Sequence, residues 1–471
     1  QQKLKVIEKG ISLSHQSDAA SLAIASDRLQ IAKNLRFFYN PGLARELDLS
    51  VEARLDGSVG AINIASESHR VGRPDLTSIS LRLAGNLSLG ALAAFGTDGA
   101  SSVELVRGDL NLGFRNGAAT LDTSKLQSLQ VGGMAQFFAS GEGNSLELSA
   151  RQSLVFNGGW WADFRGGDFS FLMAAPTIET HEFAKFGGDA ASLTATIRAQ
   201  ELEMDQRLVF RNEHSSLPTK NEFHVEASEL TLAGGFRFRG TSSTDAGAGS
   251  DRVFIETDNL LRAGLVKMTA GQGMTEFHFD ATHGTSLDRL KFVDGSGSSL
   301  VALGLNVADL GPTVLKLGAG DSTVTIDNGG AADRARYGDR LKIVATGDTD
   351  ITISNAKMAS VNIVGGDGAD RISIEGSKFT GPLIATLGAG DDSFLVETED
   401  QLGDTAFRGI VLVHLGDGDD TLGLGSDTPR SALKFLDEAF FIGGEGLDTV
   451  ASMSSAIKGI APVVAGFEVT P

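Results

Sequence analysis

Aspartates that follow closely spaced glycines are the residues best suited to chemistry in this sequence. They lie in three similar turns, 366–370 (GDGAD), 388–392 (GAGDD) and 416–420 (GDGDD). The aspartates concerned are Asp367, Asp370, Asp391, Asp392, Asp417, Asp419 and Asp420. Ca²⁺ takes six to eight oxygen ligands, and carboxylates beside open glycine carbonyls can supply them if neighbouring turns stack in register. The sequence therefore predicts calcium at these residues, although Asp and Gly also favour ordinary solvated turns.

A second cluster of chemically capable residues is Glu276, His278 and Asp280, followed by His283. In a β-strand, alternate residues share a face, so the first three would point outward together and the intervening Phe277 inward. This arrangement could bind a metal or transfer protons, or it could be a solvated polar face. The other histidines are dispersed, and no nucleophile-elbow or zincin pattern accompanies them. We therefore expect no enzyme active site.

Two further segments could bind partners. Trp160 and Trp161 are the only tryptophans of the chain and are flanked by glycine pairs. An exposed aromatic pair can anchor a sugar or a protein partner, but one of two adjacent strand residues must point inward. Near the C-terminus, a strand-like tail could pair with another molecule or cap the fold. Its apolar residues are Val463, Val464, Phe467 and Val469.

The elements that position these residues are indicated by a repeat. Gly-x-Gly phrases begin at 247, 271, 295, 318, 366, 388, 416 and 444, and a degenerate copy of the phrase around 347 fills the longest gap. Each phrase leads into an alternating apolar segment, such as 393–396 (SFLV). Repeats of this length with short strands are typical of a β-solenoid, in which glycine permits the close approach of stacked turns. We expect an all-β parallel β-helix of about 22–28 residues per rung.

The positions and regularity of the glycine phrases suggest four segments. Residues 1–45 form an N-terminal cap or joining segment, in which 21–39 is the best candidate for a short helix or cap. Residues 46–240 form a solenoid with irregular spacing, and 241–460 form one with Gly-x-Gly-x-Asp turns. The strand-like tail is 461–471. A cap would protect the edge of the first rung from pairing with another sheet.

Charge and cysteine content exclude several classes of protein. The net charge is −20, and from residue 241 onward there are 33 acidic and 17 basic residues. We therefore expect no nucleic-acid partner. There is no cysteine, which excludes disulfides and Cys-ligated metals, and no apolar stretch approaches the roughly 20 residues that span a bilayer. Because the first residue is Gln1 rather than Met, we expect that a secretory signal has been removed.

Two resemblances add to this interpretation. Residues 365–372 (GGDGADRI) and 443–450 (GGEGLDTV) resemble the haemolysin-type, or RTX, calcium-binding repeat. In that family the unit recurs every nine residues, whereas here single units stand about 24 apart. The N-terminal half, including 144–156 (NSLELSARQSLVF), resembles filamentous-haemagglutinin-type bacterial adhesins in its overall residue pattern rather than in one motif. These resemblances imply a secreted or surface-exposed bacterial protein with calcium-binding turns.

We expect a non-catalytic structural or adhesive protein that joins copies of itself head to tail, or joins other surface proteins, in a filament or array. Two alternatives remain open. The chain could be a polysaccharide-degrading β-helix enzyme, a lyase or hydrolase with carboxylates in a groove along the rungs. It could also be a monomeric adhesin that binds a glycan.

Overall fold

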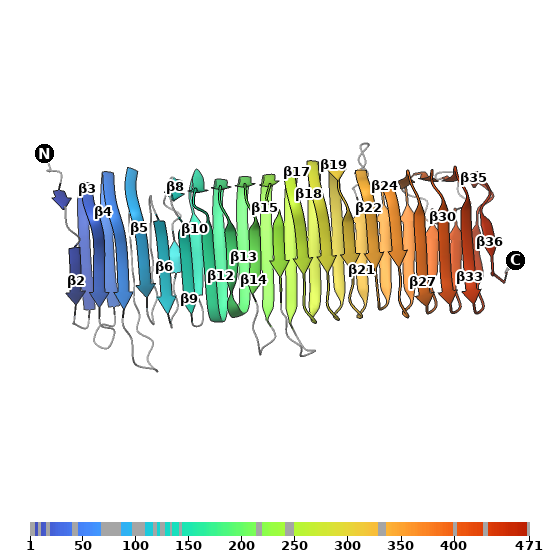
Figure 1. Ribbon diagram of the computed structural model, residues 1–471, viewed down its shortest axis with the longest axis horizontal. Coiled ribbons are helices and arrows are strands. Elements are labelled where there is room, and N and C mark those ends of the chain that lie inside the picture. The colour runs from blue at the N-terminus through green and yellow to red at the C-terminus, as the bar shows by residue number, and fades with distance from the viewer. Residues whose placement is uncertain are drawn as a thin grey trace. The chain divides into compact units, whose positions relative to one another are not determined.

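The computed structural model describes a chain of β-strands (Figure 1). It describes backbone in residues 5–7, 11–15, 19–39, 46–66, 86–96, 109–115, 120–122, 128–131, 134–140 and 144–468, except 213–218, 241–248, 328–335, 399–402 and 427–431. Side chains are described from Val131 onward, with a few further gaps. The described residues form 36 strands and no helix. The chain divides into unit 1, Gln1–Gly234, and unit 2, Gly235–Pro471.

Unit 1 is a stack of parallel strands in which each rung pairs with the next. Trp160 pairs with Ala184 and Leu202 with Leu230, so corresponding residues recur along the stack. Its strands are β1 Lys5–Ile7, β2 Ile11–His15, β3 Ala19–Tyr39, β4 Glu46–Ser66, β5 Asn86–Gly96, β6 Asp109–Arg115, β7 Thr120–Asp122, β8 Ser128–Val131, β9 Ala135–Ser140, β10 Asn144–Ser149, β11 Ser153–Phe156, β12 Trp160–Thr180, β13 Ala184–Met204, β14 Leu208–Asn212 and β15 Lys220–Leu232.

The core of unit 1 is aromatic where side chains are described. Trp160 is fully buried, and its ring stacks on Phe171 at 6.0 Å and meets Phe186 edge-on at 4.7 Å. Phe186 in turn contacts Phe210 and Phe223 of later strands. Such pairs contribute about 0.5–1.5 kcal/mol each beyond the burial of their area. Alternate residues of β12 and β13 supply this core, as the period-two pattern requires.

Unit 2 continues the same kind of parallel pairing with shorter strands. They are β16 Phe236–Arg239, β17 Ser250–Thr269, β18 Met274–Val293, β19 Ser299–Leu310, β20 Thr313–Lys316, β21 Ser322–Asp327, β22 Arg336–Val344, β23 Thr349–Ser354, β24 Lys357–Val364, β25 Asp370–Glu375, β26 Lys378–Phe379, β27 Leu383–Ala389, β28 Ser393–Val396, β29 Thr405–Phe407, β30 Val411–Asp417, β31 Thr421–Leu424, β32 Leu433–Phe435, β33 Ala439–Glu445, β34 Thr449–Met453, β35 Lys458–Gly459 and β36 Val463–Ala465.

Glycines close the turns of unit 2 because successive turns approach too closely for a side chain. Gly388, Gly416 and Gly444 have φ values of +115°, +126° and +156° and lie in one column. A Cβ atom at Gly416 would overlap the carbonyl oxygen of Gly388, and one at Gly444 would overlap that of Gly416. The repeated Gly-x-Gly phrase is thus the signature of stacked backbone.

The predicted fold is confirmed: the chain is an all-β parallel solenoid of about 24 residues per turn. The short helix considered for 21–39 is wrong, because this segment is strand β3, paired in parallel with β1, β2 and β4. Its apolar residues are spaced by two, as in Leu22 and Ile24 or Leu29 and Ile31, which suits a strand rather than a helix. Among the described residues, no helix has the length and hydropathy that a membrane crossing requires.

Candidate functional site

The aspartate turns of unit 2 are the most distinctive polar feature of the described chain. The seven predicted aspartates divide into two groups. Asp370, Asp392 and Asp420 are buried, with 1–3% of their surface exposed, whereas Asp367, Asp391, Asp417 and Asp419 are exposed. The two aspartates of each Asp-Asp pair therefore point to opposite sides of the turn, as adjacent strand residues do.

The buried group forms a ladder of hydrogen bonds between rungs, continued by Asp448. The backbone N–H of Asp370 donates to Oδ1 of Asp392 (2.8 Å), and the N–H of Asp392 donates to Oδ1 of Asp420 (2.8 Å). The N–H of Asp420 donates to Oδ1 of Asp448 (3.1 Å), and the backbone N–H of Asp448 donates to Oε2 of Glu468 (2.8 Å). Each of these aspartate carboxylates thus accepts a hydrogen bond from a backbone N–H of the rung before it. We name Asp370, Asp392, Asp420 and Asp448 the buried ladder.

Burial makes the charged form of these carboxyl groups costly. The Oδ2 atoms of Asp392, Asp420 and Asp448 are buried and accept no hydrogen bond from the described residues. Burial raises the pKa of Asp392 to about 7, and the neighbouring Asp370 and Asp420 add to the shift. Burial likewise raises the pKa of Asp370 and of Asp420 to about 6 in each case. Asp370, Asp392 and Asp420 therefore hold protons at a pH where ordinary aspartates are ionised.

The exposed aspartates form a second ladder that runs in the opposite direction. The N–H of Asp419 donates to Oδ1 of Asp391 (3.0 Å), and the N–H of Leu447 donates to Oδ1 of Asp419 (2.9 Å). Earlier in the unit, the N–H of Ala369 donates to Oδ1 of Asp348 (3.1 Å). Each of these carboxylates accepts from the rung after it, so the two ladders link neighbouring turns from both sides.

The fit of calcium differs between the two groups. In the buried ladder one carboxylate oxygen of Asp392 and of Asp420 is already occupied by a backbone N–H, and the carboxylates are one rung apart. The exposed group has oxygens open to solvent. Across the described residues, no three His, Asp or Glu side chains converge closely enough to hold a metal ion. Calcium at the seven aspartates stays a prediction, with Asp367, Asp391, Asp417 and Asp419 as its accessible ligands.

Sequence reasoning left Asp448 of the buried ladder, and Glu468 that accepts from it, off the list of site residues. Asp448 has the same position in its turn as Asp420, so the repeat itself could have identified it. Glu468 has no local signal, because it reaches the ladder only when the chain returns beside Asp448, whose carbonyl oxygen accepts the N–H of Glu468 (2.9 Å). Glu468 supplies the carboxylate that a following aspartate would otherwise provide.

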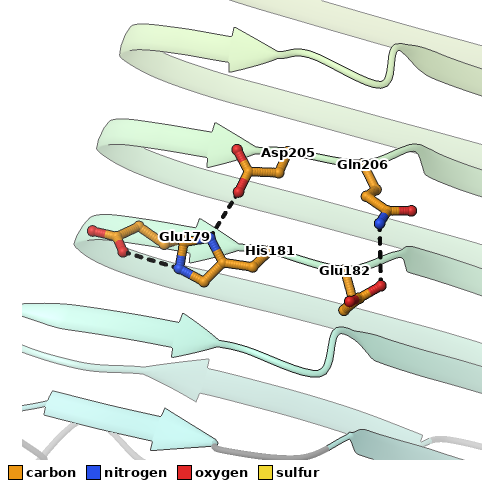
Figure 2. A network of polar contacts seen from close by, with 5 residues as sticks. All are labelled: Glu179, His181, Glu182, Asp205 and Gln206. Carbon is orange, nitrogen blue, oxygen red and sulfur yellow. Dashed lines mark hydrogen bonds and ion pairs between the residues drawn. The ribbon is translucent and has the colours of Figure 1, made fainter.

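Unit 1 contains an exposed polar network at the end of β12 and in the turns that follow β12 and β13, which the sequence did not reveal (Figure 2). Nδ1 of His181 lies 2.8 Å from Oδ2 of Asp205, and Nε2 of His181 lies 3.7 Å from Oε2 of Glu179. Gln206 donates to Glu182 on the neighbouring rung (3.1 Å). The hydrogen bond to Asp205 raises the pKa of His181. The network links two rungs through charges that remain in contact with water.

The predicted Glu276 cluster is formed as expected. Oε1 of Glu276 lies 3.0 Å from Nε2 of His278, and Oε2 lies 3.3 Å from Arg252 on β17. Asp280 follows on the same face beside Glu256 of β17, and burial together with Glu256 raises its pKa. The cluster is thus an ion-paired set of side chains on a sheet face, with one carboxyl group that is easier to protonate.

The predicted partner-binding residues differ in accessibility. Trp160 cannot contact a partner because it is fully buried in the aromatic core, which corrects that prediction. Trp161 is 37% exposed, with Nζ of Lys185 4.9 Å from its ring centroid. In the tail, Val463 and Val464 belong to β36, which pairs with β33, and Phe467 follows it. Val469 lies outside the described residues.

The comparisons with known proteins give no relative. No family model matches the chain, and neither a curated protein nor a solved structure resembles it significantly. Function must therefore be inferred from the fold and the geometry alone.

Proposed function

We propose that the chain is a non-catalytic, extracellular structural or adhesive protein whose copies join end to end through solenoid rungs. The observation that carries this proposal is the last described rung. Strands β34, β35 and β36 each pair on one side, with β31, β32 and β33, and no described strand pairs with their other side. Val463 is 51% and Met453 50% exposed at this rung. An open strand edge with apolar side chains favours pairing with another strand.

Calcium is the second part of the proposal. The resemblance of the turns to RTX repeats and the exposed carboxylates Asp391, Asp417 and Asp419 support cation binding there. Several like charges on neighbouring turns repel each other, and a divalent cation would relieve that repulsion. A bound cation would hold adjacent turns in register without taking part in any reaction. A bacterial surface location fits both resemblances and remains part of the proposal.

Light scattering and electron microscopy of the purified chain test the end-to-end joint. Val463→Lys with Ala465→Lys places two cations on the edge strand, a device by which natural sheets resist edge pairing. Ile384→Lys with Leu412→Lys is the matched control, because these exposed residues lie in the same outward column on inner rungs. We expect long particles from the native chain and the control but not from the edge variant.

The same measurements in Ca²⁺ and in chelator test the cation. Shorter particles after chelation would support calcium-ordered turns, and unchanged particles would remove calcium from the proposal. A native chain that stays monomeric at all concentrations would overturn end-to-end assembly.

A polysaccharide-degrading enzyme is a second candidate, favoured by one observation. The carboxyl groups of Glu256 and Asp280 lie on adjacent strands, and the pKa of Asp280 is raised by burial and by Glu256. A pair of neighbouring carboxyl groups, one acting as the acid and the other as the base or nucleophile, is the usual requirement for cleavage of a glycoside. Release of reducing ends from acidic and neutral polysaccharides, abolished by Asp280→Asn, would support this function, and no release from any of them would exclude it.

A further inference from the structure

Unit 2 carries a face on which basic residues repeat from rung to rung. Arg237 pairs with Lys267 and Lys267 pairs with Lys291, so three successive rungs place a cation in the same column. The column continues through Val314 to Lys342. We define the basic face as Arg237, Arg239, Lys267, Arg289, Lys291, Lys316 and Lys342. All seven are exposed or half-buried outward residues of β16, β17, β18, β20 and β22.

No acidic residue interrupts the basic face. The outward positions between its members hold Thr269, Val293, Val314 and Val344. Within the described part of the chain, no carboxylate forms an ion pair with Arg237, Lys267 or Lys291. Burial and the neighbouring cations Lys291, Arg237 and Arg239 lower the pKa of Lys267. Like charges at Arg237, Lys267 and Lys291 on adjacent strands repel each other, so this column is better matched to an anionic partner than to water alone.

The same unit carries the complementary pattern on its turns. Asp417 and Glu445 occupy one exposed column, preceded by Ala389, and Asp391 and Asp419 are linked in the neighbouring one. Asp367 is exposed on an earlier turn. No basic side chain among the described residues pairs with these five. Neighbouring rungs are about 4.8 Å apart in both patterns, because this spacing is fixed by the hydrogen bonds between strands. Two copies could therefore align several opposite charges at once without adjusting either backbone.

We propose that the basic face of one copy docks on the acidic turns of a second copy. The acidic turns of a second copy are the partner we assign to the basic face, because they match it both in charge and in the spacing between rungs. A foreign acidic polysaccharide or nucleic acid would match it in charge only. The contact uses the sides of unit 2 rather than its last rung, so it is distinct from the end-to-end joint. It also requires no calcium. Because the two surfaces differ, the contact is heterologous and can repeat from copy to copy.

Two charge-reversal variants test this contact. The basic variant carries Arg237→Glu, Lys267→Glu and Lys291→Glu, and the acidic variant carries Asp367→Lys, Asp417→Lys and Glu445→Lys. The three residues of the acidic variant are chosen because their side chains form none of the described ladder hydrogen bonds, so both ladders stay intact. The matched control is Arg371→Glu, Arg408→Glu and Lys458→Glu, which gives the same charge change as the basic variant at exposed positions elsewhere in the unit.

All proteins are examined by sedimentation in chelator, on the Val463→Lys, Ala465→Lys background that blocks the end joint. We expect the parent and the control to associate at low salt and to dissociate at high salt, where exposed charges are screened. Each variant alone should associate at least about tenfold more weakly, since its charges now repel the partner surface. An equal mixture of the two variants should associate again, because one retains the acidic turns and the other the basic face.

Several outcomes would overturn the proposal. One is a parent that is monomeric at low salt, and another is a pair of folded variants whose mixture does not associate. A third is a parent that stays monomeric but binds polygalacturonate or duplex DNA through the basic face, which would assign the face to a foreign polyanion. None of these outcomes bears on the end joint, because that joint is blocked in every sample and is tested separately.

Discussion

Both units link neighbouring rungs through polar side chains, but the links lie in opposite environments. In unit 1, His181, Asp205 and Glu179 contact each other across rungs while 34–44% of each side chain is exposed. In unit 2, Asp392 and Asp420 link rungs with 1% of their surface exposed. The first network mixes charges of both signs, whereas the second contains carboxyl groups alone. From this comparison we expect burial, more than the number of charges, to determine how strongly pH acts on a repeat.

Four rungs that precede Asp370, after Asp251, show the neutral form of the same position. Thr275, Ser299, Ser322 and Thr349 precede Asp370 in one column, and each is paired in register with the next. These hydroxyl side chains carry no charge themselves: Ser322 and Thr349 donate to glycine carbonyl oxygens, and Thr275 and Ser299 donate to the carboxyl group of Asp294. From Asp370 onward, aspartate takes the position and links each carboxylate to the preceding amide. A protonated aspartate can serve the same structural role as threonine, which explains why the buried ladder is compatible with a stable turn.

The largest expected effect follows from the close approach of the turns on which the buried ladder depends. Gly416→Ala would place a methyl group against the carbonyl oxygen of Gly388, at a φ of +126°. We expect a loss of about 3–6 kcal/mol in the stability of unit 2, from backbone strain and displacement of the neighbouring rung. Urea denaturation followed by circular dichroism measures this loss.

Gly403→Ala is the control for the glycine prediction. Gly403 also has a positive φ, +99°, but a Cβ atom there would meet no described atom within 4 Å. This variant should lose only about 1–2 kcal/mol, from strain alone. Equal losses in the two variants would show that stacking of the turns does not limit the sequence, and that the backbone conformation alone requires glycine.

Much of the fold was predictable from the sequence because the glycine phrases report directly on stacked turns. The inward position of Asp392 was also predictable in principle, since it lies two residues before Phe394, which is buried. The helix considered for 21–39 failed because its apolar residues are spaced by two, which is the period of a strand. Other features depend on residues 20 or more positions apart, as with Glu468 and Asp448 or Lys267 and Lys291. No local pattern encodes which distant residues share a column.

The second largest effect is the pH dependence of the stability of unit 2. The folded-state pKa of Asp392, about 7, lies above its ordinary value of 3.8, so folding favours the protonated form. The resulting stability is fully present below about pH 4 and is lost as the pH rises through 6 to 7, by a few kcal/mol in order of magnitude. Asp392→Asn should flatten this dependence, because an amide keeps the acceptor oxygen and carries no charge.

Hydrogen exchange at different pH values, corrected for the intrinsic exchange rate, follows this effect at the amides of Asp370 and Asp392. Both tryptophans lie in unit 1, so their fluorescence reports on unit 1 separately and should change little. Asp391→Asn is the matched control, because it removes a charge from the same turn at an exposed position. Protection that stays constant between pH 4 and 8 in the native chain would show that the buried ladder is neutralised by something other than protons, such as a bound cation.

The smallest expected effect lies in the exposed network of unit 1. The hydrogen bond to Asp205 raises the pKa of His181, so its stabilising contribution is present below the ordinary pKa of 6.5 and is lost as the pH rises through the folded-state value. Asp205→Asn should lower the pKa of His181, measured by NMR titration, and should cost under about 1 kcal/mol at pH 5, because both groups are solvated. Gln206→Ala, which removes the neighbouring uncharged contact to Glu182, should give a loss that does not depend on pH. A pH-dependent loss in Asp205→Asn as large as that expected for the buried ladder would contradict the comparison, since it would mean that an exposed ion pair stabilises a rung as strongly as a buried one.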